Sequence, residues 1–131
     1  MTLAGAPGMT PVGMMPLRLR AEDADDLAVL SACLQDALVA VRDIAYDPGA
    51  RVFMLVTNRF RWEDCRPDAR PDGLVEGAPF ERTLCGVSFE NVTTAAYRGF
   101  RRGEKDRILC LLAIRSAEGT ANAPPGLRID L

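Results

Sequence analysis

The stretch Val52-Phe-Met-Leu-Val-Thr-Asn-Arg-Phe-Arg-Trp-Glu63 changes its apolar pattern halfway along. In an extended strand, alternate side chains point to opposite sides, so the residues from Val52 to Trp62 with even numbers share one face. The first half is apolar on both faces, and the second half is apolar on the even-numbered face alone. We therefore predict a strand whose first half is covered on both sides. Phe60 and Trp62 should complete the core, and Arg59 and Arg61 should face solvent.

Upstream of this strand, the sequence predicts an amphipathic helix from Asp23 to Val41. Asp23 is a suitable N-cap, and the acidic residues after it complement the positive end of the helix dipole. The apolar side chains that fall on one side of this helix are Leu27, Leu30, Leu34, Leu38 and Val41. This stripe indicates that the helix packs on a core.

A hairpin should join the helix to the strand that begins at Val52. Its first strand is Ile44 to Tyr46, and its turn is Asp47-Pro48-Gly49-Ala50. Proline fixes φ at the first corner, and Gly49 would accept the positive φ that a tight hairpin loop usually needs.

Three further segments follow the hairpin. A loop is expected from Asp64 to Pro79, and its length marks it as functional or mobile. Arg82 to Arg98 should form a long strand with a bend at Glu90-Asn91. Ile108 to Ile114 is apolar on both faces, as in a central strand buried on both sides. Finally, Leu127, Ile129 and Leu131 alternate with polar residues and predict an edge strand.

This order of elements predicts an α+β fold. We expect an antiparallel meander of about five strands with one N-terminal amphipathic helix packed on one face; the alternative is a PH-like curved barrel. Residues 1–15 should be a disordered tail, and 16–131 a single domain. One helix covers only one side of the sheet. The other side then needs a cover, which could be sheet curvature, a second subunit, or residues absent from this sequence.

The composition excludes several classes of protein. Forty-eight per cent hydrophobic and 26% charged residues are typical of one soluble domain of 131 residues. The chain has no histidine, which excludes catalysis by histidine and metal binding through histidine ligands within one copy. A net charge of −2 makes nucleic-acid binding unfavourable. Neither an export signal nor an apolar run of membrane-spanning length is present, so we expect a cytoplasmic protein with no membrane association.

The four cysteines do not form a metal motif. None is part of a Cys-x-x-Cys pair, so we expect no metal site and no cofactor. Cys85 and Cys110 lie in predicted buried strands. Cys65, beside Asp64 and Arg66 in the predicted loop, is a weak candidate for a reactive thiol because a neighbouring arginine lowers the pKa of a thiol.

Two groups of basic residues are candidate contacts for an anion or a partner. Arg59 and Arg61 alternate with Phe60 and Trp62, and stacked arginine and aromatic groups suit phosphates or bases. The second group is Arg98, Arg101 and Arg102, in a predicted charged turn. In both cases the simpler interpretation is an ordinary solvated surface. We identify no catalytic residues.

Four blocks of the sequence are similar to a known family. They are Leu17-Arg-Leu, Asp26-Leu-Ala-Val-Leu-Ser-Ala-Cys-Leu-Gln-Asp-Ala, Asn58-Arg-Phe-Arg-Trp-Glu and Leu111-Leu-Ala-Ile. Together they resemble the small proteobacterial proteins of domain-of-unknown-function family 2948, over Pro16 to Leu131. The resemblance implies a cytosolic bacterial protein without assigned functional residues. It also implies that the chain is shortened, because related sequences continue through another strand into a C-terminal helical segment.

The leading functional hypothesis is a non-enzymatic module that binds a protein partner or itself through the uncovered sheet face. A homodimer is one form of this hypothesis. One alternative is an RNA or anion binder that uses the arginines near the end of the strand. The other is an enzyme that uses Cys65 or a carboxylate of the long loop.

Overall fold

The computed structural model describes residues 1–5, 17–61, 82–122 and 124–131. These residues form one α-helix, one short 3₁₀ helix and nine strands. In chain order the elements are β1 (Thr2–Gly5), β2 (Arg18–Arg20), α1 (Ala24–Leu34), β3 (Ala37–Ala40), η1 (Val41–Asp43), β4 (Ile44–Asp47), β5 (Val52–Phe60), β6 (Arg82–Phe89), β7 (Ile108–Leu111), β8 (Ala113–Ala117) and β9 (Gly126–Asp130).

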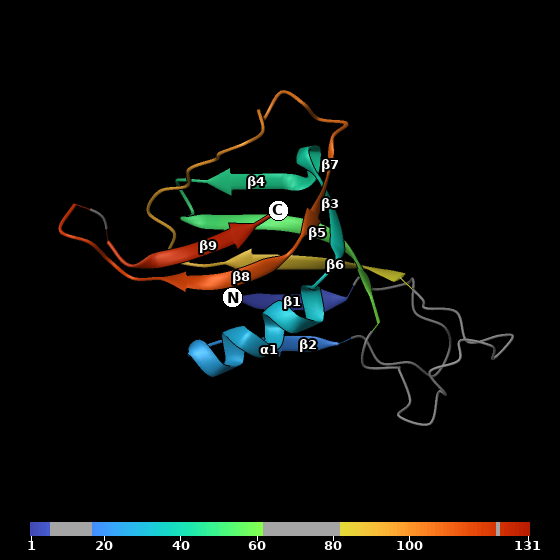
Figure 1. The fold of residues 1–131 in the computed structure, drawn as a ribbon, viewed down its shortest axis with the longest axis horizontal. Coiled ribbons are helices and arrows are strands. Elements are labelled where there is room, and N and C mark those ends of the chain that lie inside the picture. The colour runs from blue at the N-terminus through green and yellow to red at the C-terminus, as the bar shows by residue number, and fades with distance from the viewer. Residues whose placement is uncertain (6–16, 62–81, 123) are drawn as a thin grey trace, which may run out of the picture.

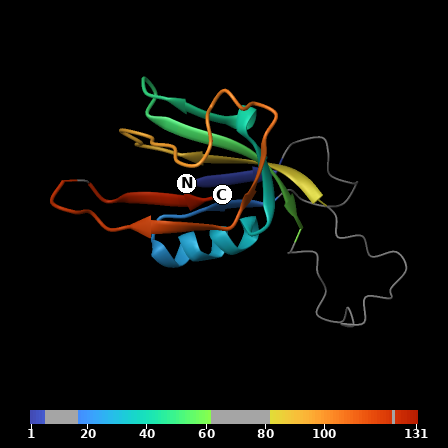
Figure 2. The ribbon, with the colours of Figure 1, turned by 45° about the horizontal axis from the view of Figure 1, so that its top comes forward.

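Seven strands form one antiparallel sheet in the order β2-β1-β6-β5-β3-β7, and β4 also pairs with β5 (Figure 1). Strands β8 and β9 form a separate hairpin that lies with α1 on one side of the large sheet (Figure 2). The predicted α+β class with one helix on one face is confirmed. The alternative of a PH-like barrel is wrong, because the large sheet is open. The number of strands also differs from the prediction: about five were expected, and the described residues form nine.

The core lies between one face of the large sheet and its cover. Leu3, Val87 and Leu55 are aligned across β1, β6 and β5, and all are buried. Leu30 and Leu34 of α1 and Ile114 of β8 belong to the same buried cluster. We call this side of the sheet the inner face and the opposite side the outer face.

The two faces of β5 are the reverse of the prediction. Leu55, Thr57 and Arg59 on the inner face are each 1% exposed and Arg61 is 8% exposed, whereas Met54 is 45% and Val56 41% exposed. Arg59 and Arg61 therefore do not face solvent, and the first half of the strand is covered on one side only. Phe60 lies on the outer face, where the guanidinium carbon of Arg82 stands 3.8 Å from the centroid of the Phe60 ring. Trp62 lies outside the described residues.

The register explains this reversal. Leu55 pairs with Val87, and Thr57 with Cys85, so these odd-numbered residues join the buried face of β6. A strand keeps its odd and even residues on fixed sides unless a bulge intervenes. Once Leu55 faces α1, Arg59 must face the same side.

The helix begins as predicted and ends earlier. The Asp23 carboxylate caps α1 by accepting a hydrogen bond from the Asp26 N–H at 2.8 Å. The helix stops at Leu34, and Asp36 takes a φ of 61°. Leu38 then lies in β3, because the Asp36 N–H donates to the carbonyl of Leu111 and leads the chain into pairing with β7.

The hairpin between β4 and β5 is confirmed, with one difference. Its register joins Asp47 to Val52, and the Asp47 carboxylate accepts hydrogen bonds from the N–H groups of Gly49 and Ala50. Arg51, not Gly49, takes the positive φ, at 55°. The hydrogen bonds to Asp47 therefore hold the loop in a conformation that does not require a positive φ at Gly49.

Two predicted strands are shorter than expected. Strand β6 ends at Phe89, directly before the predicted bend, where Asn91 takes a φ of 60°. Ile108 to Ile114 is divided between β7 and β8, and β7 lies at the edge of the sheet with Ile108 exposed on the outer face. The expectation of a central strand buried on both sides is wrong.

The N-terminal segment also differs from the prediction. Thr2–Gly5, which we expected to be disordered, form β1 between β2 and β6, with Leu3 fully buried. A four-residue strand without a hydropathy period carries little signal in sequence, because its neighbours supply most of its stability. Residues 6–15 of the predicted tail lie outside the described residues.

Candidate functional site

The outer face of the large sheet carries five exposed aliphatic side chains, which we call the outer-face patch. They come from β3, β5, β6 and β7, which are neighbours in the sheet. Their exposed fractions are 37% for Leu38, 45% for Met54, 41% for Val56, 39% for Leu84 and 54% for Ile108.

The strand pairing places these side chains close together. Leu84 pairs with Asn58, Asn58 with Leu38, and Leu38 with Cys110, so one row crosses four strands. Val56 pairs with Gly86, where an added Cβ would meet only the Ala4 carbonyl oxygen, at 4.0 Å. The patch is thus apolar with an uncharged centre. Cys110, expected to be buried, is an exposed thiol there.

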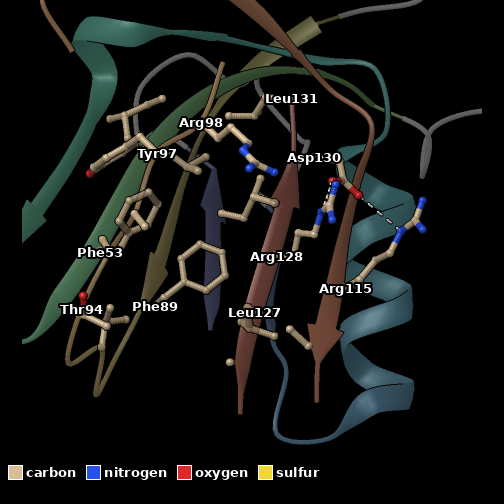
Figure 3. A pocket seen from close by; sticks show the side chains of 18 of the residues that line it. Phe53, Phe89, Thr94, Tyr97, Arg98, Arg115, Leu127, Arg128, Asp130 and Leu131 are labelled. Carbon is tan, nitrogen blue, oxygen red and sulfur yellow. Dashed lines mark hydrogen bonds and ion pairs between the residues drawn. The ribbon is translucent and has the colours of Figure 1, made fainter. Parts of the chain in front are cut away.

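A second surface lies on the opposite side of the sheet, between the inner face and the β8–β9 hairpin (Figure 3). It is an open cleft of about 1360 Å³, which we call the hairpin cleft. Phe53 and Phe89 come from the sheet, Tyr97 from the segment after β6, and Leu127 and Leu131 from the chain at and beyond β9. The cleft therefore joins parts of the chain that are far apart in sequence.

Aromatic rings line one wall of the hairpin cleft. The ring centroids of Phe53 and Phe89 are 5.8 Å apart in an edge-to-face arrangement. Tyr97 stands 6.4 Å from Phe53 and 5.7 Å from Phe100. Such edge and tilted pairs stabilise an aromatic cluster beyond the burial of area. The Tyr97 hydroxyl oxygen is buried, and within the described residues it has no hydrogen-bond partner.

Arginines border the same cleft. Asp130 accepts from Arg128 Nε at 2.6 Å and also pairs with Arg115 Nε at 3.5 Å, so one carboxylate faces two guanidinium groups (Figure 3). Arg98 also lines the cleft, and it makes no ion pair with any described residue. The net charge of these four side chains is therefore positive.

The turn after Phe100 is held by Glu104. Its carboxylate accepts hydrogen bonds from the Arg101 N–H at 2.9 Å and from Arg107 Nη1 at 3.2 Å. The bond from the Arg101 backbone, followed by that from the Arg107 side chain, lowers the pKa of Glu104. Arg102 lies in the same turn, with its guanidinium 5.5 Å from the centroid of the Tyr97 ring.

The structure does not bring the predicted contact residues together. Arg98 borders the hairpin cleft near Phe53, whereas Arg59 lies six positions further along β5, about 20 Å away at the rise of an extended strand. Arg59 Nη1 donates to the carbonyl of Phe60 at 2.9 Å, and the Arg59 side chain is buried. Trp62 and Cys65 lie outside the described residues. A contact role for these residues stays a prediction.

Sequence reasoning missed the aromatic wall and the pairing around Asp130. Phe53 and Phe89 were predicted only as strand residues. The segment Tyr97-Arg98-Gly99-Phe100, which holds two aromatic residues near an arginine, could have indicated a binding surface. The alternation of Arg128 and Asp130 placed these side chains on one face without naming a partner. Arg115 becomes that partner only through the pairing of β8 with β9.

Two general features of the described residues bear on function. No cluster of three or more cysteine, aspartate and glutamate side chains suited to a metal ion occurs in these parts of the chain. None of their helices is both long and apolar enough to cross a membrane.

Comparison with known proteins places the chain in a family. Residues 17–130, which are most of the chain, match a family model described as Protein of unknown function (DUF2948). No curated protein and no solved structure matches the chain.

Proposed function

The chain belongs to the DUF2948 family of proteins of unknown function, and we propose that it is a non-enzymatic module that self-associates through the outer-face patch. The observation that carries this proposal is the exposure of Leu38, Met54, Val56, Leu84 and Ile108 on four neighbouring strands. Monomeric soluble proteins rarely expose a contiguous apolar surface of more than a few hundred Å², and larger patches mark interfaces.

A second copy is the occupant that this surface suits best. In a two-fold dimer the same patch meets itself, so charges at its centre would face like charges. Here the positions between the aliphatic side chains hold Asn58, Gly86 and Cys110, which are uncharged. Two sheets can pack face to face at a spacing of about 10 Å, which aliphatic side chains fill. Arg82, the charged residue nearest to them on β6, is the first residue of that strand and lies at the rim.

The test is the oligomeric state of the purified chain over a range of concentrations. We expect light scattering coupled to size exclusion to show a concentration-dependent dimer. Val56→Glu would bury a carboxylate from each copy in the apolar interface of this dimer and should shift the protein to monomer. Val29→Glu is the matched control, because Val29 is 57% exposed on α1, away from the patch. A monomeric wild type, or equal effects of the two variants, would contradict self-association through this face.

Cys110 gives a second measurement on the unmodified chain. Its thiol is exposed on the outer face and should react with a maleimide when the protein is dilute. Self-association through the patch should slow this reaction as the protein concentration rises, with the modified residue identified by mass spectrometry. A labelling rate at Cys110 that is independent of concentration would argue that the dimer uses another surface.

A further inference from the structure

We propose that the hairpin cleft binds an extended acidic segment of another protein, which adds as a strand to the free edge of β9. This site is on the inner side of the sheet, opposite the outer-face patch, and it does not require self-association. Four observations support the proposal: a free strand edge, the size of the cleft, its aromatic wall and its charge.

The free edge belongs to β9. Within the described residues β9 pairs with β8 and with no other strand. The consecutive residues Gly126 to Leu131 all line the cleft. If only one face of the strand bordered the cleft, alternate residues would line it, because successive side chains point to opposite sides. The cleft therefore borders β9 along its whole length, and the edge of β9 that does not pair with β8 carries backbone N–H and C=O groups of the kind that strand addition uses.

The size of the cleft favours a polypeptide over a small molecule. Small-molecule pockets are usually about 300–1,000 Å³ and enclose most of their ligand. The hairpin cleft has about 1360 Å³, is open to solvent, and is lined by residues from Ile44 in β4 to Leu131 after β9, together with Met1. An extended segment fills an open groove along its length and obtains its affinity from backbone hydrogen bonds.

The aromatic wall provides for apolar side chains of that segment. Phe53, Phe89 and Tyr97 present rings from different parts of the chain to one cleft. In an added strand, every second side chain would face this wall.

The charge of the cleft selects an acidic segment. Its lining includes Arg98, Arg107, Arg115 and Arg128 but only two acidic side chains, Glu90 and Asp130. Arg107 is already paired with Glu104, which does not line the cleft, so the remaining side chains give three positive and two negative charges, a balance of +1, in a chain whose net charge is −2. Charges opposite to those of the partner raise the rate of encounter and reject wrong partners.

The first experiment measures fluorescence anisotropy with a labelled peptide in which valine and glutamate alternate, somewhat longer than the five residues of β9. We expect saturable binding that weakens with added salt, and binding at least about tenfold weaker for the matching valine–lysine peptide, a factor that corresponds to about 1.4 kcal/mol. Equal binding of the two peptides would overturn the selection for acidic segments. Binding of dodecanoate, measured by calorimetry, together with no measurable peptide binding would show a site for amphiphiles and overturn the proposal.

Two charge-reversal variants locate the site. Arg98→Glu should reduce peptide affinity about tenfold or more, because it inverts a charge that lines the cleft. Arg101→Glu is the matched control, since Arg101 is exposed three residues further along the chain and does not line the cleft. Circular dichroism would verify that both variants are folded. Equal losses in the two variants would reduce the interaction to general electrostatic attraction and contradict a site in the cleft.

Backbone methylation of the peptide tests strand addition itself. In an antiparallel ladder, alternate N–H groups point toward the neighbouring strand. N-methylation of one alternating set should abolish binding, whereas methylation of the other set should leave it nearly unchanged. Indifference to the set that is methylated would overturn strand addition. Val56→Glu, on the outer face, should bind the peptide as the wild type does, so failure of this proposal and failure of self-association are separate results.

Discussion

The two faces of β5 are built from similar residues and have opposite environments. On the inner face, Leu55 and Thr57 are buried beneath α1 and the β8–β9 hairpin. On the outer face, Met54 and Val56 remain exposed, although both are as apolar as the residues inside. The difference teaches that apolar character alone does not select the buried face. The face is selected by the elements that have a surface to bury against it.

The largest test of this comparison replaces one apolar side chain on each face. Leu55→Ala should lower the free energy of unfolding by about 3 kcal/mol, because it leaves a cavity in a packed core. Met54→Ala removes a side chain that is half exposed and should cost about 0.5 kcal/mol or less in dilute protein. Urea denaturation gives both values. Equal costs would mean that the outer face is covered in solution.

The next test weakens the cover of the inner face. The Ile114 N–H donates to Ser31 Oγ at 2.9 Å, a bond that ties β8 to α1. Ser31→Ala should cost about 1–2 kcal/mol, because the buried N–H loses its acceptor. Ser116→Ala, at an exposed position of the same strand, should be nearly neutral. If thermal melting shows the same change for both variants, the bond contributes nothing to the attachment of the hairpin.

A smaller effect is expected at the start of the helix that covers the inner face. Asp23→Ala removes the N-cap and should cost about 1 kcal/mol, since the Asp26 N–H loses its side-chain acceptor. Asp25→Ala changes a charge in the same turn without removing a cap. It should cost only a few tenths of a kcal/mol through the helix dipole. Chemical denaturation that ranks these two variants in the reverse order would contradict the assigned cap.

The smallest effect concerns pH at the turn beside the hairpin cleft. The pKa of Glu104 is lowered in the folded protein, so the folded state favours the charged carboxylate. The stability that this carboxylate contributes is present above its ordinary pKa and is lost as the pH falls through its folded pKa. An NMR titration should show the lowered pKa in the wild type and a higher value in Arg107→Gln. An unchanged value in that variant would exclude the Arg107 side chain as a cause.

The sequence predicted the α+β class, the start of the helix and the hairpin, because each depends on local chemistry. Asp23 caps whatever helix follows it, and Asp47 organises a turn through its own neighbours. The end of the helix was not predictable in the same way. Leu34 and Leu38 fit a helical stripe equally well, and Leu38 was moved into β3 by pairing with β5 and β7.

The candidate surfaces were partly foreseen. An uncovered sheet face was expected from the balance of apolar residues, but the even-numbered residues of β5 were assigned to the core, and Met54 and Val56 lie on the uncovered face. The hairpin cleft was not foreseen, since it forms only where β9, the segment around Tyr97 and the inner face of the sheet meet. Arg98 was predicted as a candidate anion or partner contact only because of its charge.

The sequence by itself determined that β5 would be a strand with apolar residues on both sides, since alternation and local turns are properties of neighbouring residues. Tertiary structure alone decided which side became the interior. The pairing of Leu55 with Val87, and the packing of α1 and Ile114 over them, carried Thr57, Arg59 and Arg61 inside and left Met54 and Val56 outside. Burial depends on the whole sheet and on the elements that cover it. Because odd- and even-numbered residues of a strand lie on opposite faces, the choice of buried face is made for all of them together.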